Sequence, residues 1–467
     1  MPNFWEFEVW GFISLVGTLL ISLLAANIIK KKVPFLRDSL IPTSVLGGVM
    51  LLLISVIYEA IFGEMFFNTT YFGGNGAEAL EIITYHALAL GFIATAFKST
   101  GAKQTKKRAG EIFDTGVTTV STYLLQAVLG LGITLIAALV MTDFFSAAGV
   151  LLPFGYGQGT GQALNYGTIY ENDHGFVGGR SFGLTVAALG FLSAAIGGVI
   201  HLNLLKRRGA VIVHEDDSVH TLHAEDVQAA DEIPMNGSMD KISVQFAFVF
   251  GAYMLTHAFL LILGNLLPGL KSVLYGFNFL IGVLLATLCR CVCGALRRRG
   301  VMKRQYVNSF LMDRISGFCF DLMVVAGIAA IRIGVLKRYW VVILILGVVG
   351  AFSTYYYNLY VARKLFPRYS EEQFLMMYGM LTGTASTGVI LLRELDPDFK
   401  TPASDNLVYQ NFPAIVFGFP MMLLATLAPK KPLLTFLILV GFFVVMNVIL
   451  FRRQIFRRRR VKASPEE

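Results

Sequence analysis

The residues best suited to bind a small ligand are grouped in a glycine-rich stretch at 149–176, GVLLPFGYGQGTGQALNYGTIYENDHGF. Glycine leaves backbone groups open to close approach, and the amides and hydroxyls between the glycines can donate or accept hydrogen bonds. The candidate substrate-binding residues here are Gly157, Gln158, Gly159, Thr160, Gly161 and Asn165. The stretch is too polar to face lipid, and its apolar start is unusual for a surface loop. An extramembrane loop packed on helix ends is the alternative.

A second stretch, 374–399, repeats this pattern in the other half of the chain. Its candidate substrate-binding residues are Gly383, Thr384, Ser386 and Thr387. Both stretches lie between long apolar segments, and both end in Glu-x-Asp-x-x-Phe, beginning at Glu171 and at Glu394. Paired interruptions at corresponding places in two halves indicate the binding site of a transporter.

Non-helical backbone at membrane depth is tolerated only where protein or a wet cavity surrounds it. We therefore expect two re-entrant hairpins, at 150–171 and 374–393. Their tips would offer free N–H groups and a helix dipole to an anionic solute.

A coupling cation would need oxygen ligands from hydroxyls, amides or unwound backbone. The candidates are Thr160, Ser386, Asp321 and Gln126, and each small polar residue could instead serve close helix packing. Asp321 lies within an apolar segment, where a carboxylate is costly and marks function by default. It could bind a cation, carry a proton, or simply pair with Arg314. Gln126 and Asn358 occupy corresponding places in the two halves.

Composition indicates an all-α integral membrane protein. The chain has 467 residues, is 55% hydrophobic, has a mean hydropathy of +0.65 and contains many apolar runs near the length of a span. The runs do not alternate as barrel strands do. The net charge of +9 comes from basic flanks of apolar runs and does not indicate nucleic acid. We expect no enzyme, because no soluble domain is large enough, and no metal site, because the Cys289–Cys293 run lacks further ligands.

About eleven transmembrane helices are expected, at about 9–29, 40–62, 79–97, 113–141, 180–205, 242–264, 272–293, 309–331, 340–362, 404–428 and 432–451. Basic clusters follow the first, third, fifth, seventh and ninth of them, so the N-terminus is expected outside and the C-terminus in the cytoplasm.

The domain organisation follows from this order. Residues 1–205 form an N-terminal repeat of five spans, 206–241 a polar cytoplasmic linker, 242–428 a C-terminal repeat, and 429–467 an extra span with a basic tail. Because five spans precede the linker, the second repeat starts on the opposite side of the membrane. Inverted repeats of this kind suit alternating access.

In the two glycine-rich stretches and in several of the apolar segments, the sequence resembles the bacterial glutamate:sodium symporter family (ESS, GltS-like proteins). The resemblance covers about residues 9–428 and is most specific in the first hairpin. It is carried by Gly157-x-Gly159-Thr160-Gly161-x-Ala163, Gly175-Phe176, Gly197-Gly198, Ile41-Pro42-x-x-Val45-x-Gly47-Gly48, Gln126 and Gly383-Thr384-Ala385-Ser386-Thr387. The sequence departs from the family at Tyr156-Gly157-Gln158-Gly159, at Tyr378-Gly379-Met380-Leu381, at Asp321, and in having the span 432–451.

This resemblance implies a homodimeric secondary transporter of the bacterial inner membrane, with two inverted five-helix repeats and an elevator-like motion. It implies symport of glutamate, or a related small carboxylate, with Na⁺ as the coupling ion and without another cofactor. A relative for a different solute, or one coupled to protons through Asp321, is the alternative. A channel would need a continuous pore. Two glycine-rich hairpins that enter from opposite faces favour an occluded site instead. An intramembrane enzyme would need a catalytic cluster in the spans, and none is visible in the sequence.

Overall fold

The chain is all-α, as its sequence predicts. The computed structural model describes residues 3–98, 106–208, 232–235, 239–268, 271–396 and 400–455. Within these ranges the regular structure consists of helices, and the one β-bridge joins Glu232 to Gln305.

Nine helices of the described residues are long and apolar enough to cross a membrane. The chain therefore has the helices of a multi-pass membrane protein, and each lies in one of the eleven predicted segments. They are α1 (Phe7–Lys32), α3 (Thr43–Phe62), α4 (Gly76–Phe97), α5 (Lys106–Val140), α7 (Gly179–Arg207), α9 (Lys241–Leu266), α11 (Asn278–Arg298), α14 (Trp340–Leu365) and α19 (Pro432–Leu450).

The other two predicted segments have a different form. The segment 309–331 is helix α12 (Ser309–Ala329), which carries Asp313, Arg314 and Asp321 and is less apolar for that reason. The segment 404–428 is interrupted at Gln410, between α17 (Ala403–Tyr409) and α18 (Asn411–Leu427). A short helix, α10 (Lys271–Gly276), also precedes α11 within the predicted segment 272–293.

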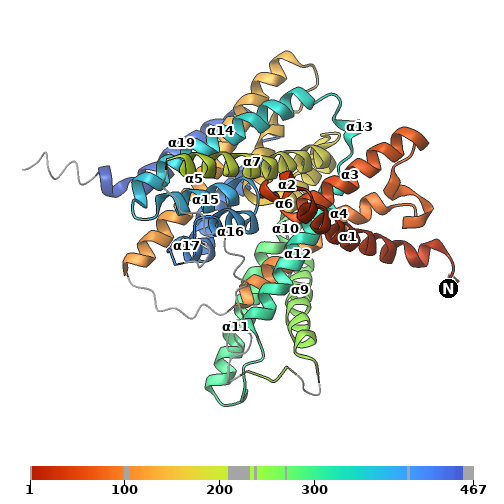
Figure 1. Cartoon of the computed structure of the whole chain (residues 1–467), viewed down its shortest axis with the longest axis horizontal. Coiled ribbons are helices and arrows are strands. Elements are labelled where there is room, and N and C mark those ends of the chain that lie inside the picture. The colour runs from red at the N-terminus through yellow and green to blue at the C-terminus, as the bar shows by residue number, and fades with distance from the viewer. Residues whose placement is uncertain are drawn as a thin grey trace, which may run out of the picture. The chain divides into compact units, whose positions relative to one another are not determined.

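The chain divides into two compact units, and each unit takes segments from both predicted repeats. The first unit comprises residues 1–26, 46–102 and 214–330. In its core, α4 packs against α9, α11 and α12. Figure 1 shows α9, α11 and α12 in its lower part. Gly91 of α4 allows this approach, because a Cβ there would lie 2.8 Å from the Phe320 ring of α12.

Part of the predicted linker packs on the first unit. Glu232 is buried and accepts from Lys241 Nζ at 2.7 Å and from Asn308 Nδ2 at 2.6 Å. Most of 206–241 and the tail after Ile455 lie outside the described residues.

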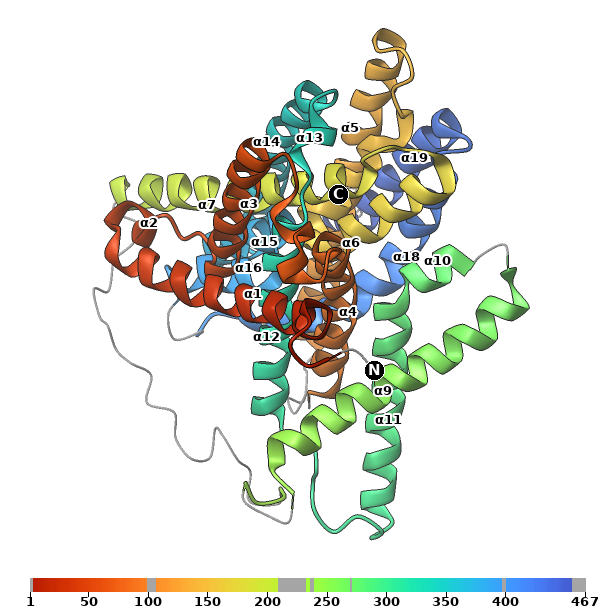
Figure 2. The same ribbon diagram turned by 90° about the vertical axis from the view of Figure 1, so that its right-hand side faces the viewer.

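The second unit comprises residues 27–45, 103–213 and 331–467. It contains both glycine-rich stretches, which form α6 (Leu151–His174) and the pair α15 (Ser370–Thr382) and α16 (Ala385–Arg393). Helix α5 packs against α6, α14, α18 and α19, so it supports four helices of this unit, and Figure 2 shows it beside α19. The extra span α19 is part of the same support, since Tyr357 Oη of α14 donates to Asn447 Oδ1 at 2.9 Å.

Candidate functional site

The first glycine-rich stretch folds back on itself at a single residue. Gly159 has φ 78° and ψ −171° inside α6, in a region of backbone space that is essentially restricted to glycine. The rings of Phe154 and Tyr166 stack with centroids 3.8 Å apart. Along one straight helix these positions would be about 18 Å apart. The stretch is therefore a hairpin of two helical arms, referred to below as hairpin 1, with its tip at Gly159.

The second stretch has the same design. Helix α15 ends at Thr382, Gly383 and Thr384 are non-helical, and α16 begins at Ala385. The two arms touch at Gly379 and Gly388, where a Cβ on Gly379 would lie 2.8 Å from the Gly388 Cα. Only very small residues permit this contact, and the sequence supplies glycine on both arms. We refer to this element as hairpin 2.

Helix α5 holds both hairpins just before their tips. Breaking a helix leaves carbonyl groups without their usual N–H partners. Tyr123 Oη donates to the Gly157 carbonyl of hairpin 1 at 3.1 Å, and Gln126 Nε2 donates to the Leu381 carbonyl of hairpin 2 at 2.9 Å. Both donors lie within one turn of α5, so the two tips lie at the same level of that helix.

Helix α7 brings the tips close together. A Cβ on Gly190 would overlap the Thr382 carbonyl of hairpin 2 and would lie 3.2 Å from the Tyr156 ring of hairpin 1. The Gly197-Gly198 pair of α7 similarly faces Tyr378 and Leu391 of hairpin 2. Small residues of this kind let helices approach closely in membrane proteins.

Three glutamines beside the tips have buried polar atoms without a hydrogen-bond partner among the described residues. They are Gln126 through Oε1, Gln158 through Nε2, and Gln162 through both polar atoms. Gln126 is 0% exposed and Gln162 is 1% exposed. Buried amides in proteins normally make their hydrogen bonds, and leaving one unmade is costly. These atoms can therefore bind a solute, an ion or an ordered water that supplies the missing partners.

The arms that meet here carry no Asp, Glu, His, Lys or Arg between positions 151 and 170 or between 373 and 392. The charges available at the tips are thus helix dipoles. Helix α16 begins at hairpin 2's tip, where its first N–H groups favour an anion. The carbonyls that end α15 at the same tip favour a cation.

The structure brings most of the predicted site residues together in these two hairpins. Thr160 and Asn165 are buried in hairpin 1, and Thr387 is buried in hairpin 2, with its Oγ1 3.4 Å from that of Thr384. Ser386, a predicted cation ligand, is exposed. Asp321 is exposed on α12 and belongs to the first unit, whereas the hairpins belong to the second. Arg314 pairs with Asp313 at 3.3 Å.

Sequence analysis did not identify the donor Tyr123, nor Gln162 with its two polar atoms that have no partner among the described residues. It also missed a polar stripe on α5 that leads to Gln126. Thr115 accepts from Gln373 at 3.3 Å, Thr119 donates to Gln410 at 2.6 Å, and Thr122 donates to Asn358 at 3.4 Å. The helical spacing of these threonines within an apolar segment was the available signal.

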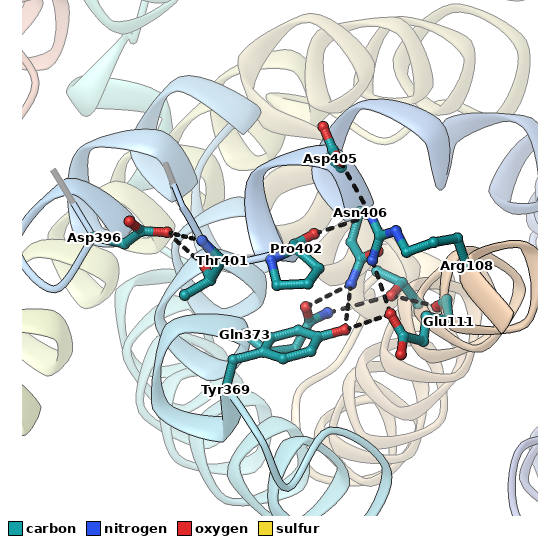
Figure 3. Close-up of polar contacts among 10 residues, drawn as sticks. Arg108, Glu111, Tyr369, Gln373, Asp396, Thr401, Pro402, Asp405 and Asn406 are labelled. Atoms are coloured by element: carbon teal, nitrogen blue, oxygen red, sulfur yellow. Dashed lines mark hydrogen bonds and ion pairs between the residues drawn. The ribbon is translucent and has the colours of Figure 1, made fainter. Parts of the chain in front are cut away.

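A polar cluster lies at one end of this stripe, where α5, α15 and α17 begin (Figure 3). Tyr369 Oη donates to Glu111 at 3.1 Å and accepts from Asn406 Nδ2 at 3.2 Å. Arg108 pairs with Glu111 at 2.8 Å and with Asp405 at 3.3 Å. Asp396 accepts from the Thr401 amide at 2.7 Å, shortly before α17 begins. Burial and the neighbouring Glu111 raise the pKa of Tyr369 to about 12, so its hydroxyl stays protonated as a donor.

Two hydrogen-bonded residue pairs join α5 to α14, and both donors lie on α5. Gln126 Nε2 donates to Thr354 Oγ1 at 2.8 Å, and Thr122 donates to Asn358 Oδ1 at 3.4 Å. The later residue on one helix pairs with the earlier residue on the other, so the helices cross antiparallel. Gln126 and Asn358, the two amides at corresponding places in the predicted repeats, thus each pair with a threonine of the other helix, Gln126 as donor and Asn358 as acceptor.

Comparison with models of known protein families finds no match for this chain, and comparison with curated protein sequences finds none either.

Proposed function

We propose that the chain is a secondary active transporter that carries glutamate, or a related small carboxylate, into the cell together with sodium. One observation carries this proposal. Two helical hairpins meet on α5 beside buried amide atoms of Gln126, Gln158 and Gln162 that have no hydrogen-bond partner among the described residues. Helices interrupted at a shared point are how transporters expose backbone to a solute at membrane depth.

The charge balance of the site favours symport. Burying an isolated carboxylate or an isolated cation is very costly, and the hairpin arms carry no Asp, Glu, His, Lys or Arg between positions 151 and 170 or between 373 and 392. A carboxylate that enters with Na⁺ has its charge compensated by its own partner. The N-terminal end of α16 and the amide donors of Gln158 and Gln162 suit the carboxylate, whereas the carbonyl ends of broken arms and the Gln126 oxygen suit the cation.

The transport cycle we infer is alternating access. In this proposal the hairpins are re-entrant and belong to two inverted repeats, hairpin 1 entering from outside and hairpin 2 from the cytoplasm. Each of the two helices contributes one amide and one threonine to the pairs Gln126–Thr354 and Thr122–Asn358, and this placement supports the inverted relationship. The protein would be a homodimer of the bacterial inner membrane, with its N-terminus outside and its C-terminus in the cytoplasm.

A thermal-shift screen of the purified chain tests this proposal. Amino acids and dicarboxylates would be added in sodium buffer and in potassium buffer of equal ionic strength. Glutamate or a related carboxylate should raise the melting temperature only in sodium, because a ligand of the folded state stabilises by mass action. If no acidic solute shifts the transition in either buffer, the proposed substrate class is wrong.

A proton-coupled transporter, or one for another solute, is the second candidate. Asp321 favours it, as an intramembrane carboxylate that the hairpin site does not use. Uptake into proteoliposomes separates the two candidates. Uptake driven by a sodium gradient and retained in Asp321→Asn supports sodium coupling. Uptake driven by a pH gradient and lost in Asp321→Asn supports proton coupling.

A further inference from the structure

A groove of about 400 Å³ lies between α7 and α14 in the second unit. Its lining on α7 extends from Leu189 to Leu204, which is about 22 Å of helix at about 1.5 Å a residue. Its walls are exposed apolar side chains, including Leu192, Ile196 and Phe352. The groove is therefore long, narrow and apolar, and its volume is within the range of ligand pockets.

The floor of the groove is made by the hairpins. Tyr156 of hairpin 1 and Tyr378 of hairpin 2 both line it. Tyr156 Oη donates to the Gly347 carbonyl at 2.6 Å, and Tyr378 Oη donates to the Ser193 carbonyl at 2.9 Å. Because both hydroxyls are already bonded, the floor offers ring surfaces to an occupant and no free donor. An apolar chain fits this floor better than a polar solute does.

One end of the groove is strongly basic. Helix α7 ends in Lys206 and Arg207 and is followed by Arg208, directly beyond the lining residue Leu204. Arg208 and Arg363 both interact electrostatically with Tyr355, which lines this end of the groove. Arg363 pairs with Glu371, whereas Arg207 and Arg208 are exposed and form no ion pair within the described part of the chain.

We propose that this groove binds one acyl chain of an anionic phospholipid, with the lipid phosphate held by Arg207 and Arg208. Charge complementarity selects the headgroup, since basic clusters at the ends of membrane helices attract anionic lipid. The apolar walls take the chain. The bound chain covers Tyr156 and Tyr378 and so supports the first arms of both hairpins. This proposal concerns lipid binding and does not depend on the transported solute.

Native mass spectrometry of the detergent-solubilised chain tests the proposal, with phosphatidylglycerol and phosphatidylcholine of matched acyl chains added as probes. The wild type should retain one phosphatidylglycerol in preference to phosphatidylcholine. Ala351→Trp, which fills the groove, should lose it, while Leu139→Trp, at an 88% exposed position on α5, should keep it.

Changing the basic end tests the headgroup. Arg207→Gln with Arg208→Gln should reduce the preference for phosphatidylglycerol by roughly tenfold or more, from about 1 kcal/mol for each basic residue. The matched control changes Arg298 and Arg299, an exposed basic pair where α11 ends, and should leave the preference intact. Equal retention of the two lipids by the wild type, or an equal loss in both double variants, would overturn the proposal.

A second measurement tests the proposal without the groove-filling variant Ala351→Trp. Phe352→Trp places a fluorophore of similar size on the groove wall, and the wild type reports the background of the native tryptophans. Brominated phosphatidylglycerol, at a low fraction in phosphatidylcholine vesicles, should quench Phe352→Trp more than brominated phosphatidylcholine does. Equal quenching by the two brominated lipids would overturn the proposal. A dimer that Ala351→Trp disrupts would also overturn it, because a second copy of the chain would then cover the groove.

Discussion

The Gln126 side chain of α5 donates to the Leu381 carbonyl at 2.9 Å, directly before the tip of hairpin 2. The same Nε2 lies 2.8 Å from Thr354 Oγ1 on α14. One buried amide thus joins three elements, and its oxygen remains without a partner in the described part of the chain.

Replacing Gln126 with Leu should therefore destabilise hairpin 2. The change leaves the Leu381 carbonyl buried without its donor, at a cost of about 1–3 kcal/mol. Thermal unfolding of the purified protein measures the loss. Thr354→Val is the matched control, because it removes one partner of Gln126 and keeps the bond to Leu381. A Thr354→Val variant as unstable as Gln126→Leu would show that the carbonyl is not the important partner.

Replacing Gln162 with Leu should have the opposite effect on stability. Neither polar atom of this buried side chain has a partner in the described part of the chain, so an apolar side chain of similar size relieves a desolvation cost of about 1–3 kcal/mol. The melting temperature without solute should rise, and the solute-induced shift should disappear. Gln245→Leu is the control, since that amide donates to the Tyr306 carbonyl at 2.9 Å and its loss should only destabilise. A lower melting temperature for Gln162→Leu would contradict the assignment.

Gly190→Ala should force hairpin 2 away from α7. The added Cβ would overlap the Thr382 carbonyl, and overpacking of this kind costs about 1–3 kcal/mol. We expect a lower melting temperature together with weaker solute binding, since the tip itself is displaced. Gly441→Ala on α19 adds the same group in open space and should lower neither quantity. Normal binding in Gly190→Ala would argue against a site at the tips.

The stability of the base of hairpin 2 should depend on acid pH through Glu371. A hydrogen bond from His201 at 2.8 Å, and then Arg363, lowers the pKa of this carboxyl. A lowered folded-state pKa contributes stability that is present above the unfolded value of about 4.3 and is lost as pH falls through the folded value. Glu371→Gln should therefore melt earlier at pH 7 and lose less stability on acidification.

The neighbouring Glu372 provides a control, because its pKa is shifted in the opposite direction from that of Glu371. Burial raises the pKa of Glu372, so its ionisation opposes folding as pH rises above the unfolded value. Glu372→Gln should be as stable as the wild type at pH 7, or more stable. Parallel melting curves for the two variants from pH 7 down to pH 3.5 test both signs, and a loss of stability at pH 7 in both would contradict the argument.

The extra helix α19 should stabilise α5 through Arg452. Its Nη1 donates to Asp114 Oδ1 at 2.8 Å, and Asp114 is only 6% exposed. Arg452→Gln leaves that carboxylate with only Arg453, whose Nη1 lies 4.0 Å away, and should cost about 1–3 kcal/mol. The double change Asp114→Asn with Arg452→Gln removes the uncompensated charge and should recover part of the loss. If the two single changes and the double change were simply additive, the pair would not be coupled.

Local properties of the sequence determined the class of the protein and the places where its helices break. Apolar runs near twenty residues predict membrane helices because hydrocarbon demands internally satisfied backbone, and nine of the eleven predicted runs contain such a helix. The clusters around Gly159 and Gly383 predicted the two interruptions, because glycine and small polar residues weaken a helix wherever they gather.

Only the tertiary structure decided which residues meet at those interruptions. Local composition did not show that hairpin 1 turns at Gly159 alone, since a stacked pair such as Phe154 and Tyr166 forms only once the arms have folded back. It also did not pair Tyr123 with Gly157 or Gln126 with Leu381, because these bonds join segments far apart in the chain. Asp321 stood out by charge, but charge alone could not assign it to one compact unit or the other.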